Sequence, residues 1–206
     1  MACSFELEEE LRAEGWKSVA GVDEAGRGPL AGPVTAGAVI LPEGFDPGRL
    51  NDSKKLTENA RELLYETITS NREVIWASGT ASVEEIDEIN ILNATYLAMA
   101  RAIEGLSKAA DLALVDGKPV KGLPVPQKAV IKGDGLSFSI AAASIIAKVE
   151  RDRLMRQYAK EFPEYGFEKH KGYGTKVHLE SLQTHGVTPI HRRSFRPIAE
   201  LAGETS

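Results

Sequence analysis

The chain has 206 residues, of which 42% are hydrophobic and 27% are charged, with a formal net charge of −5. This composition is typical of a soluble globular protein with one domain, or one domain with a small appendage. Cys3 is the only cysteine, which excludes a disulfide within the monomer. The acidic N-terminus argues against a signal peptide, and the longest uncharged stretch, 28–42, is too short and proline-rich for a bilayer span. We therefore expect a cytoplasmic protein.

The charge is unevenly distributed along the chain. Residues 1–14 hold five glutamates against one arginine, whereas 169–196 gathers six basic residues and all four histidines, opposed only by Glu180. A local basic cluster binds phosphate groups whatever the net charge of the molecule. From charge alone, a solvated basic tail is an equally good interpretation.

Strand and helix patterns alternate along the chain. Segments rich in β-branched or apolar residues predict five strands, over 19–26, 34–41, 73–81, 112–117 and 130–134. Helical patterns begin at Thr57 and at Ser82, where Ser82 and Glu85 form a capping box, and extend to about 68 and 106. A long helix over 139–162 and a short one over 175–183 follow.

This order of elements predicts an α/β fold with a mixed five-stranded sheet flanked by helices. The three early strands form an antiparallel meander, and the later strand–helix alternation adds parallel strands. We expect residues 1–162 to form the core, and 163–206 to form a basic, helical C-terminal segment packed on it.

Acidic residues lie at or near the carboxyl ends of predicted strands, where open α/β sheets gather their ligands: Asp23, Glu24, Asp116 and Asp134. Carboxylates collected there repel one another unless cations bind between them, and oxygen ligands suit Mg²⁺ or Mn²⁺. The pattern indicates a two-metal site for phosphoryl transfer. For any single Asp-Gly pair, a plain turn is the competing interpretation. Because adjacent strand residues face opposite ways, either the strand ends at this point or Glu24 contributes obliquely or through its backbone carbonyl.

Two glycine-flanked residues are candidates for substrate contact. Arg27 lies between Gly26 and Gly28, so it can hold a phosphate on a backbone that approaches closely; a tight turn is the alternative. Tyr173 lies between two glycines beside basic residues and can stack on a sugar or base; a buried tyrosine is the alternative.

Six blocks in order along the chain resemble the ribonuclease HII family. They are VAGVDEAGRGPLAGPV (19–34), NDSKKL (51–56), LVDGKPV (114–120), IKGDG (131–135), AAASIIAKVERDRLM (141–155) and HKGYGT (170–175). The resemblance covers roughly 19–197. It implies a ribonuclease H-like fold with a helical C-terminal part. It also implies an endonuclease that hydrolyses the RNA strand of RNA/DNA hybrids and cuts 5′ of single ribonucleotides in duplex DNA, leaving 3′-hydroxyl and 5′-phosphate ends.

The resemblance also assigns roles to residues. The four acids would hold two Mg²⁺ or Mn²⁺ ions, and the Arg27 turn and Tyr173 would sense the 2′-hydroxyl at the RNA–DNA junction. Ser53 and Lys54 would lie near the substrate backbone. We expect sequence-independent phosphate contacts from four further residues: His170, Lys171, Arg192 and Arg193. Lys148, Arg151 and Arg153 are interpreted as a solvated helix face, with substrate contact as the less favoured alternative.

The implied partners are RNA/DNA hybrids and ribonucleotide-containing DNA, and we expect a monomer without a membrane association. The chain ends soon after Pro197, and no clamp-binding motif of the QxxLxxFF type is present. We also expect no N-terminal domain of the kind found in the related ribonuclease HIII, which favours type HII. Two other functions are alternatives that the sequence disfavours. A non-catalytic hybrid-binding module would not need the four acids, and an aspartyl phosphatase would need an Asp-x-Asp motif.

Overall fold

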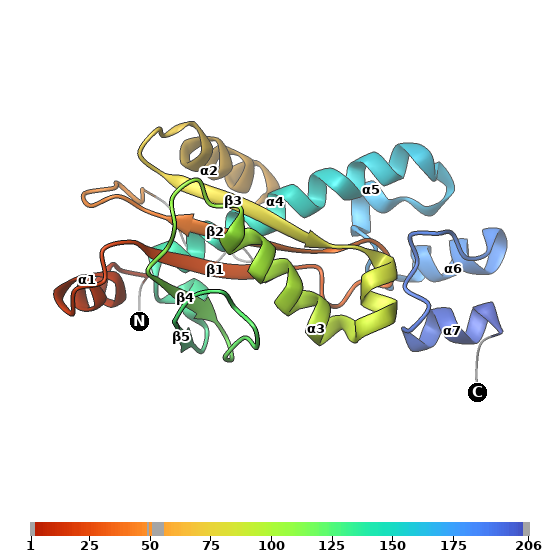
Figure 1. Ribbon diagram of the computed structural model, residues 1–206. Coiled ribbons are helices and arrows are strands. Elements are labelled where there is room, and N and C mark those ends of the chain that lie inside the picture. Colours follow the sequence, from red (N-terminus) through yellow and green to blue (C-terminus); the bar gives the residue numbers. More distant parts are fainter. Residues whose placement is uncertain (1–2, 49, 51–55, 204–206) are drawn as a thin grey trace.

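A mixed five-stranded sheet in the order β3-β2-β1-β4-β5 organises the molecule (Figure 1). The computed structural model describes residues 3–48, 50 and 56–203. The strands are β1 Val19–Ala25, β2 Val34–Ile40, β3 Ile75–Ala81, β4 Leu112–Asp116 and β5 Gln127–Val130. β1, β2 and β3 pair antiparallel, whereas β4 pairs parallel to both β1 and β5. This arrangement confirms the predicted fold class.

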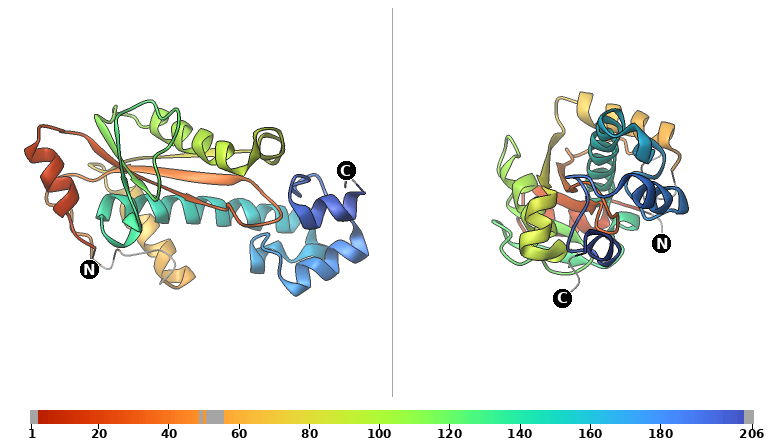
Figure 2. Two further views of the ribbon diagram at one scale, coloured as in Figure 1. Left: turned by 90° about the horizontal axis from the view of Figure 1, so that it is seen from below. Right: turned by 90° about the vertical axis from the view of Figure 1, so that its right-hand side faces the viewer.

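Helices cover both faces of the sheet and extend beyond one end of it. They are α1 Glu6–Ala13, α2 Glu58–Ser70, α3 Val83–Glu104, α4 Phe138–Glu161, α5 Phe167–His170, α6 Lys176–His185 and α7 Arg196–Ala202. Figure 2 shows α3 on one face and α4 on the other, with the two termini at opposite ends of the molecule. Among the described residues, no helix is both long enough and apolar enough to cross a bilayer.

The close approach of α4 to the sheet depends on glycines in the strands. A methyl group added at Gly21 would lie 2.0 Å from the carbonyl carbon of Ser139, and one at Gly37 would lie 2.3 Å from the carbonyl oxygen of Ala143. The run Ala141–Ala143 completes this fit with small side chains, all fully buried. The first half of α4 therefore packs directly on the backbones of β1 and β2.

Two local predictions were wrong or incomplete. The fifth strand ends at Val130 rather than continuing to Asp134, because Lys132 takes a left-handed conformation (φ 58°) and residues Gly133–Gly135 form a short 3-10 helix, η2. The long third helix is interrupted at Asn90, whose φ is 67°. The Asn90 side chain there accepts hydrogen bonds from the N–H groups of Leu92 and Asn93, so it caps the second half of α3.

The C-terminal helices pack beyond the end of the sheet, around the last turns of α4 (Figure 1). Their apolar cluster includes Tyr165, Phe167 and Leu182, and it also takes in Leu30 from the β1–β2 connection and Met155 from α4. This segment therefore shares its core with the sheet-bearing part of the chain. The division at residue 162 stays a prediction.

Candidate active site

Three carboxylates converge at the carboxyl ends of β1 and β4. One oxygen each of Asp23, Asp116 and Asp134 lies within 4.8 Å of the others. The parallel pairing of β1 with β4, in which Val22 faces Val115, brings the first two acids side by side. Asp134 arrives from η2, and the Gly133 N–H fixes that turn by donating to Asp116 Oδ1 at 2.6 Å. A donor set made of carboxylates alone fits a hard divalent cation.

The electrostatics of this cluster favour a bound cation. Asp23 is only 4% exposed. Burial raises the pKa of Asp23 well above its usual value, and the charges of Glu24 and Asp116 raise it further; a hydrogen bond with Ser144 opposes them. The ionised cluster is thus unfavourable by itself, and a positive charge among the three carboxylates would relieve it.

Glu24 behaves as its strand position requires. It lines the same cavity as Asp23, but its carboxylate accepts from Arg27 Nη1 at 3.2 Å and is not among the three converging oxygens. The geometry therefore supports metal binding by Asp23, Asp116 and Asp134, and a direct contact between the Glu24 side chain and that metal stays a proposal.

Asp23, Glu24 and Asp116 line a cavity of about 250 Å³ that also carries basic and polar groups. Lys148 and Ser144 reach it from α4, and Arg61 reaches it from α2. Lys148 Nζ donates to Asp152 Oδ1 at 2.6 Å, and burial lowers the pKa of Lys148. Ser144 and Arg61 were not predicted to lie at the site, and substrate contact was only the less favoured interpretation of Lys148. The signal was present, because positions 144, 148, 151 and 155 share one helix face with the small residues that pack on the sheet.

The Gly26-Arg27-Gly28 turn and Tyr173 form another wall of the cavity. Gly26 has a φ of 94°, and a methyl group there would lie 2.0 Å from Arg151 Nε. A carbon added at Gly28 would lie 3.6 Å from the Tyr173 ring, so the ring and the turn are in direct proximity. Arg27 and Tyr173 are both exposed, as substrate contact requires.

The predicted phosphate contact of Arg192 does not fit the structure. Its side chain is 0% exposed, and its guanidinium donates to the carbonyls of the β1–β2 connection. Arg151, interpreted from sequence as a solvated residue, is 1% exposed, and within the described residues its side chain also donates only to carbonyls. Both corrections have the same cause, since a guanidinium can satisfy several backbone acceptors inside a fold when no helix or sheet uses them.

The other predicted substrate contacts lie in different surroundings. Lys171 is 7% exposed, and its Nζ donates to the carbonyl of Glu168. His170 is half-buried, with Nε2 on the carbonyl of Tyr165 and Nδ1 accepting from the Gly172 N–H. Arg193 is exposed. Ser53 and Lys54 lie outside the described residues.

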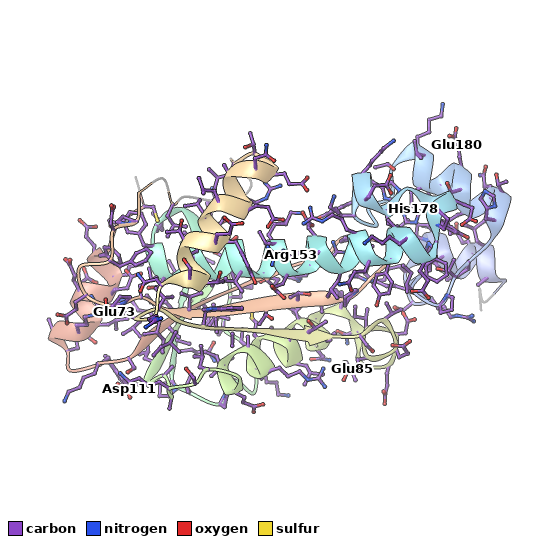
Figure 3. All side chains as sticks on the ribbon, turned by 90° about the horizontal axis from the view of Figure 1, so that it is seen from above. Glu73, Glu85, Asp111, Arg153, His178 and Glu180 are labelled. Carbon is purple, nitrogen blue, oxygen red and sulfur yellow. The ribbon has the colours of Figure 1, made fainter. Side chains whose placement is uncertain are left out.

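Two buried histidines, His178 and His191, stabilise the Tyr173 loop from the protein interior through a chain of hydrogen bonds. His191 Nδ1 accepts from the Thr188 N–H at 3.0 Å, so its Nε2 carries the proton and donates to His178 Nε2 at 3.0 Å. His178 Nδ1 then donates to the carbonyl of Tyr173 at 2.9 Å. His178 lies on α6 in the C-terminal part (Figure 3). The relay requires both rings to be neutral.

Comparison with known proteins identifies the family. The family model "Ribonuclease HII" matches residues 20–198 of the chain. The chain belongs to the ribonuclease HII family. The curated ribonuclease HII of Desulfitobacterium hafniense is 54% identical over 193 residues, which cover 94% of this chain and 74% of that protein. The chain is therefore a ribonuclease H, an endonuclease that acts on RNA/DNA hybrids and depends on divalent metal ions. Membership of this family excludes both alternative functions, the non-catalytic hybrid-binding module and the aspartyl phosphatase.

Solved structures share the fold. Ribonuclease H2 from Pyrococcus horikoshii is 29% identical, with a TM-score of 0.77, and the match covers 91% of this chain and 98% of that one. Bst-RNase HIII, solved in complex with Mn²⁺, has a TM-score of 0.68 at 15% identity, covering 92% of this chain and 70% of its own. The second likeness supports the ribonuclease H-like fold alone.

Proposed function

We propose that this ribonuclease HII cuts on the 5′ side of a ribonucleotide embedded in duplex DNA, leaving 3′-hydroxyl and 5′-phosphate ends. The observation that carries the proposal is the proximity of the Tyr173 ring to the Gly26-Arg27-Gly28 turn, beside the three converging carboxylates. A sugar held between ring and turn places its neighbouring phosphate at the acids. Such an enzyme would serve the removal of ribonucleotides and RNA primers from DNA.

The residues of the cavity divide the work. Arg27 can hold a phosphate, and the turn approaches the sugar closely because it has no side chain at positions 26 and 28. Tyr173 stacks on the sugar or base next to the scissile phosphate. Lys148 adds a positive charge beside the acids, where the negatively charged phosphate arrives. Exposed Arg193 contributes a sequence-independent phosphate contact farther along the duplex.

Asp23, Asp116 and Asp134 would hold two Mg²⁺ or Mn²⁺ ions, with Glu24 completing the shell. When bound, the ions lower the pKa of the attacking water and stabilise the leaving 3′ oxygen. The chain contributes the fixed geometry of the carboxylates, of which Asp116 is held by the Gly133 N–H.

The test is single-turnover cleavage of duplex DNA containing one ribonucleotide, with Mg²⁺ and with EDTA as control. We expect one cut on the 5′ side of the ribonucleotide and none with EDTA. Asp116→Asn should lower the rate by several orders of magnitude while binding of the duplex survives, because the asparagine oxygen still accepts from Gly133 but carries no charge. Near-normal cleavage by this variant would remove Asp116 from the metal site, and cutting on the 3′ side would overturn the proposed product.

A further inference from the structure

Arg192 holds the Gly26-Arg27-Gly28 turn from inside the protein. Its Nη2 donates to the carbonyl of Gly26 at 2.5 Å, and its Nη1 donates to the carbonyl of Arg27 at 2.9 Å. The same guanidinium reaches the end of the connection, where Nε donates to Gly32 and Nη2 to Pro33, at 2.9 and 3.2 Å. One side chain from the C-terminal segment thus fixes both ends of the connection between β1 and β2.

Arg151 joins this connection to the Tyr173 loop. From α4, its Nη2 and Nε donate to the carbonyls of Ala31 and Pro33 at 3.1 and 3.0 Å. Its Nη1 donates to the carbonyl of Lys171 at 3.0 Å, two residues before Tyr173. The two guanidiniums together therefore fix the position of the Tyr173 loop relative to the Gly26-Arg27-Gly28 turn.

These two charges are buried without carboxylate partners. Among the described residues, neither arginine forms an ion pair, and every side-chain hydrogen bond of either goes to a backbone carbonyl. Burial lowers the pKa of Arg151 to about 10 and that of Arg192 to about 9, so both remain charged at neutral pH. Burying an unpaired charge is costly, and a purely structural contact could have used neutral side chains.

The hydrogen bonds of Arg192 also orient two peptide groups. All described peptide bonds are trans, and in a planar trans peptide the C=O and N–H point in opposite directions. The carbonyls of Gly26 and Arg27 point toward Arg192, so the N–H groups of Arg27 and Gly28 point away from it. Both residues line the cavity. Within the described part of the chain, no hydrogen bond uses either N–H group.

We propose that Arg151 and Arg192 are positioning residues that never touch the substrate. They turn the N–H groups of Arg27 and Gly28 toward the ribose and hold Tyr173 opposite them, so that recognition of a lone ribonucleotide depends on both arginines. The buried charge of Arg192 polarises the same two peptide groups and strengthens their N–H groups as donors. This inference rests on the proposed function.

The experiment compares two substrates under single-turnover conditions at saturating enzyme: duplex DNA with one ribonucleotide, and a uniform RNA/DNA hybrid. Arg192→Lys keeps the charge but cannot reach four carbonyls. We expect its rate on the single ribonucleotide to fall on the order of 10²-fold, the effect of a small displacement of the scissile phosphate. On the uniform hybrid, where any of several phosphates satisfies the site, we expect a loss below about tenfold.

Arg156→Lys is the matched control, since Arg156 lies on α4 and pairs with Glu58 and Glu62 at the surface. Both of its rates should equal those of wild type. Equal losses on the two substrates for Arg192→Lys, or no loss in a folded variant, would overturn the inference. If the wild type itself leaves the single ribonucleotide uncut, the proposed function fails instead.

A measurement on the unmodified protein covers the case in which Arg192→Lys does not fold. Amide hydrogen exchange in EDTA should be fast at Arg27 and Gly28 in the free enzyme. It should slow when duplex DNA with one ribonucleotide is added, but not with all-DNA duplex. Protection of these two amides in the free enzyme, or equal protection by both duplexes, contradicts the proposed orientation. The same two rates are measured for Arg151→Lys, which loosens only the Ala31, Pro33 and Lys171 contacts. Its rate should also fall more on the single ribonucleotide than on the uniform hybrid.

Discussion

Tyr173 combines an exposed ring with a constrained backbone. The residue is 47% exposed, so its ring is accessible to a ligand. Its N–H donates to the carbonyl of His170 at 2.9 Å, and its carbonyl accepts from Thr175 and His178. The loop therefore presents the ring in one place, as a recognition platform requires.

We expect Tyr173→Ala to impair cleavage at a lone ribonucleotide by on the order of 10²-fold, because misplacing the scissile phosphate by about 1 Å costs that much. The fold and divalent-ion binding should be unchanged. Tyr173→Phe should be milder if stacking dominates, and as damaging as alanine if the hydroxyl makes the contact. Single-turnover rates for the three proteins decide. An alanine variant as fast as wild type would make Tyr173 structural.

At the scale of single residues, the sequence predicted which acids gather at the site better than it predicted which basic residues are buried. Asp23, Asp116 and Asp134 were selected because each lies at or near the carboxyl end of a predicted strand, and the structure brings their oxygens together. Arg192 and Arg193 were indistinguishable as neighbours in a basic cluster, yet one is fully buried and the other is exposed. Burial depends on which carbonyls the β1–β2 connection leaves unused, and this is a tertiary property.

The histidine relay connects secondary-structure elements through neutral rings. Burial lowers the pKa of His178, and burial with the nearby His178 ring lowers the pKa of His191 to about 4 from its usual 6.5. Protonation of His178 would place two N–H groups against each other between α6 and the segment that follows it, and protonation of His191 would place its Nδ1–H against the Thr188 N–H. The relay should therefore fail as the pH falls.

The direction in which pH changes the folding stability follows from the protons that His191 binds in the folded and unfolded states. The unfolded chain takes up a proton at His191 near pH 6.5, and the folded protein does so only near pH 4, so this stabilisation is complete above about 6.5 and is lost as the pH falls toward 4. We expect the free energy of unfolding to fall by on the order of 3 kcal/mol across that pH range.

Urea unfolding at a series of pH values measures this fall, and His191→Gln should flatten the dependence of the unfolding free energy on pH. His185→Gln, at an exposed position of α6, should not. A wild-type slope that His191→Gln leaves unchanged would place the titrating group elsewhere.

Element prediction succeeded where the local signal agreed with the packing. The Ser82–Glu85 capping box begins α3 as expected, and the small residues of 141–144 do pack on the sheet. The fifth strand was misplaced because the apolar pair Val130 and Ile131 favoured a strand that continues to Asp134, whereas Lys132 takes a left-handed conformation and η2 follows it. The kink at Asn90 was missed because the apolar period of α3 continues through it.

For the whole molecule, the acidic cluster couples stability to metal binding. Asp23, Asp116 and Asp134 repel one another at the end of the sheet, and a ligand that binds only the folded state stabilises it. The unfolding free energy should therefore rise with divalent ions, by about 2.7 kcal/mol at a concentration 100 times the dissociation constant.

We expect Asp116→Asn to raise the melting temperature in EDTA, because one repelling charge is gone, and to reduce the increase on adding Mg²⁺ or Mn²⁺. Glu180→Gln is the control, since Glu180 is exposed on α6 (Figure 3) and does not line the cavity of the acids. Its melting temperature should respond to the ions like that of wild type. An equal ion-induced increase in Asp116→Asn and wild type would argue against ion binding at these three acids.

The packing of α4 on β1 and β2 limits how the length of the chain can change. Ser144, beside Asp23, and Arg151, which holds the Tyr173 loop, lie on this one helix, whose first half is fixed by its contact with the glycines of the strands. An inserted residue between them would rotate Arg151 by about 100° and move it about 1.5 Å along the axis. Insertions and deletions compatible with activity are therefore expected in connections such as 42–48 and 117–126, and not within 139–151.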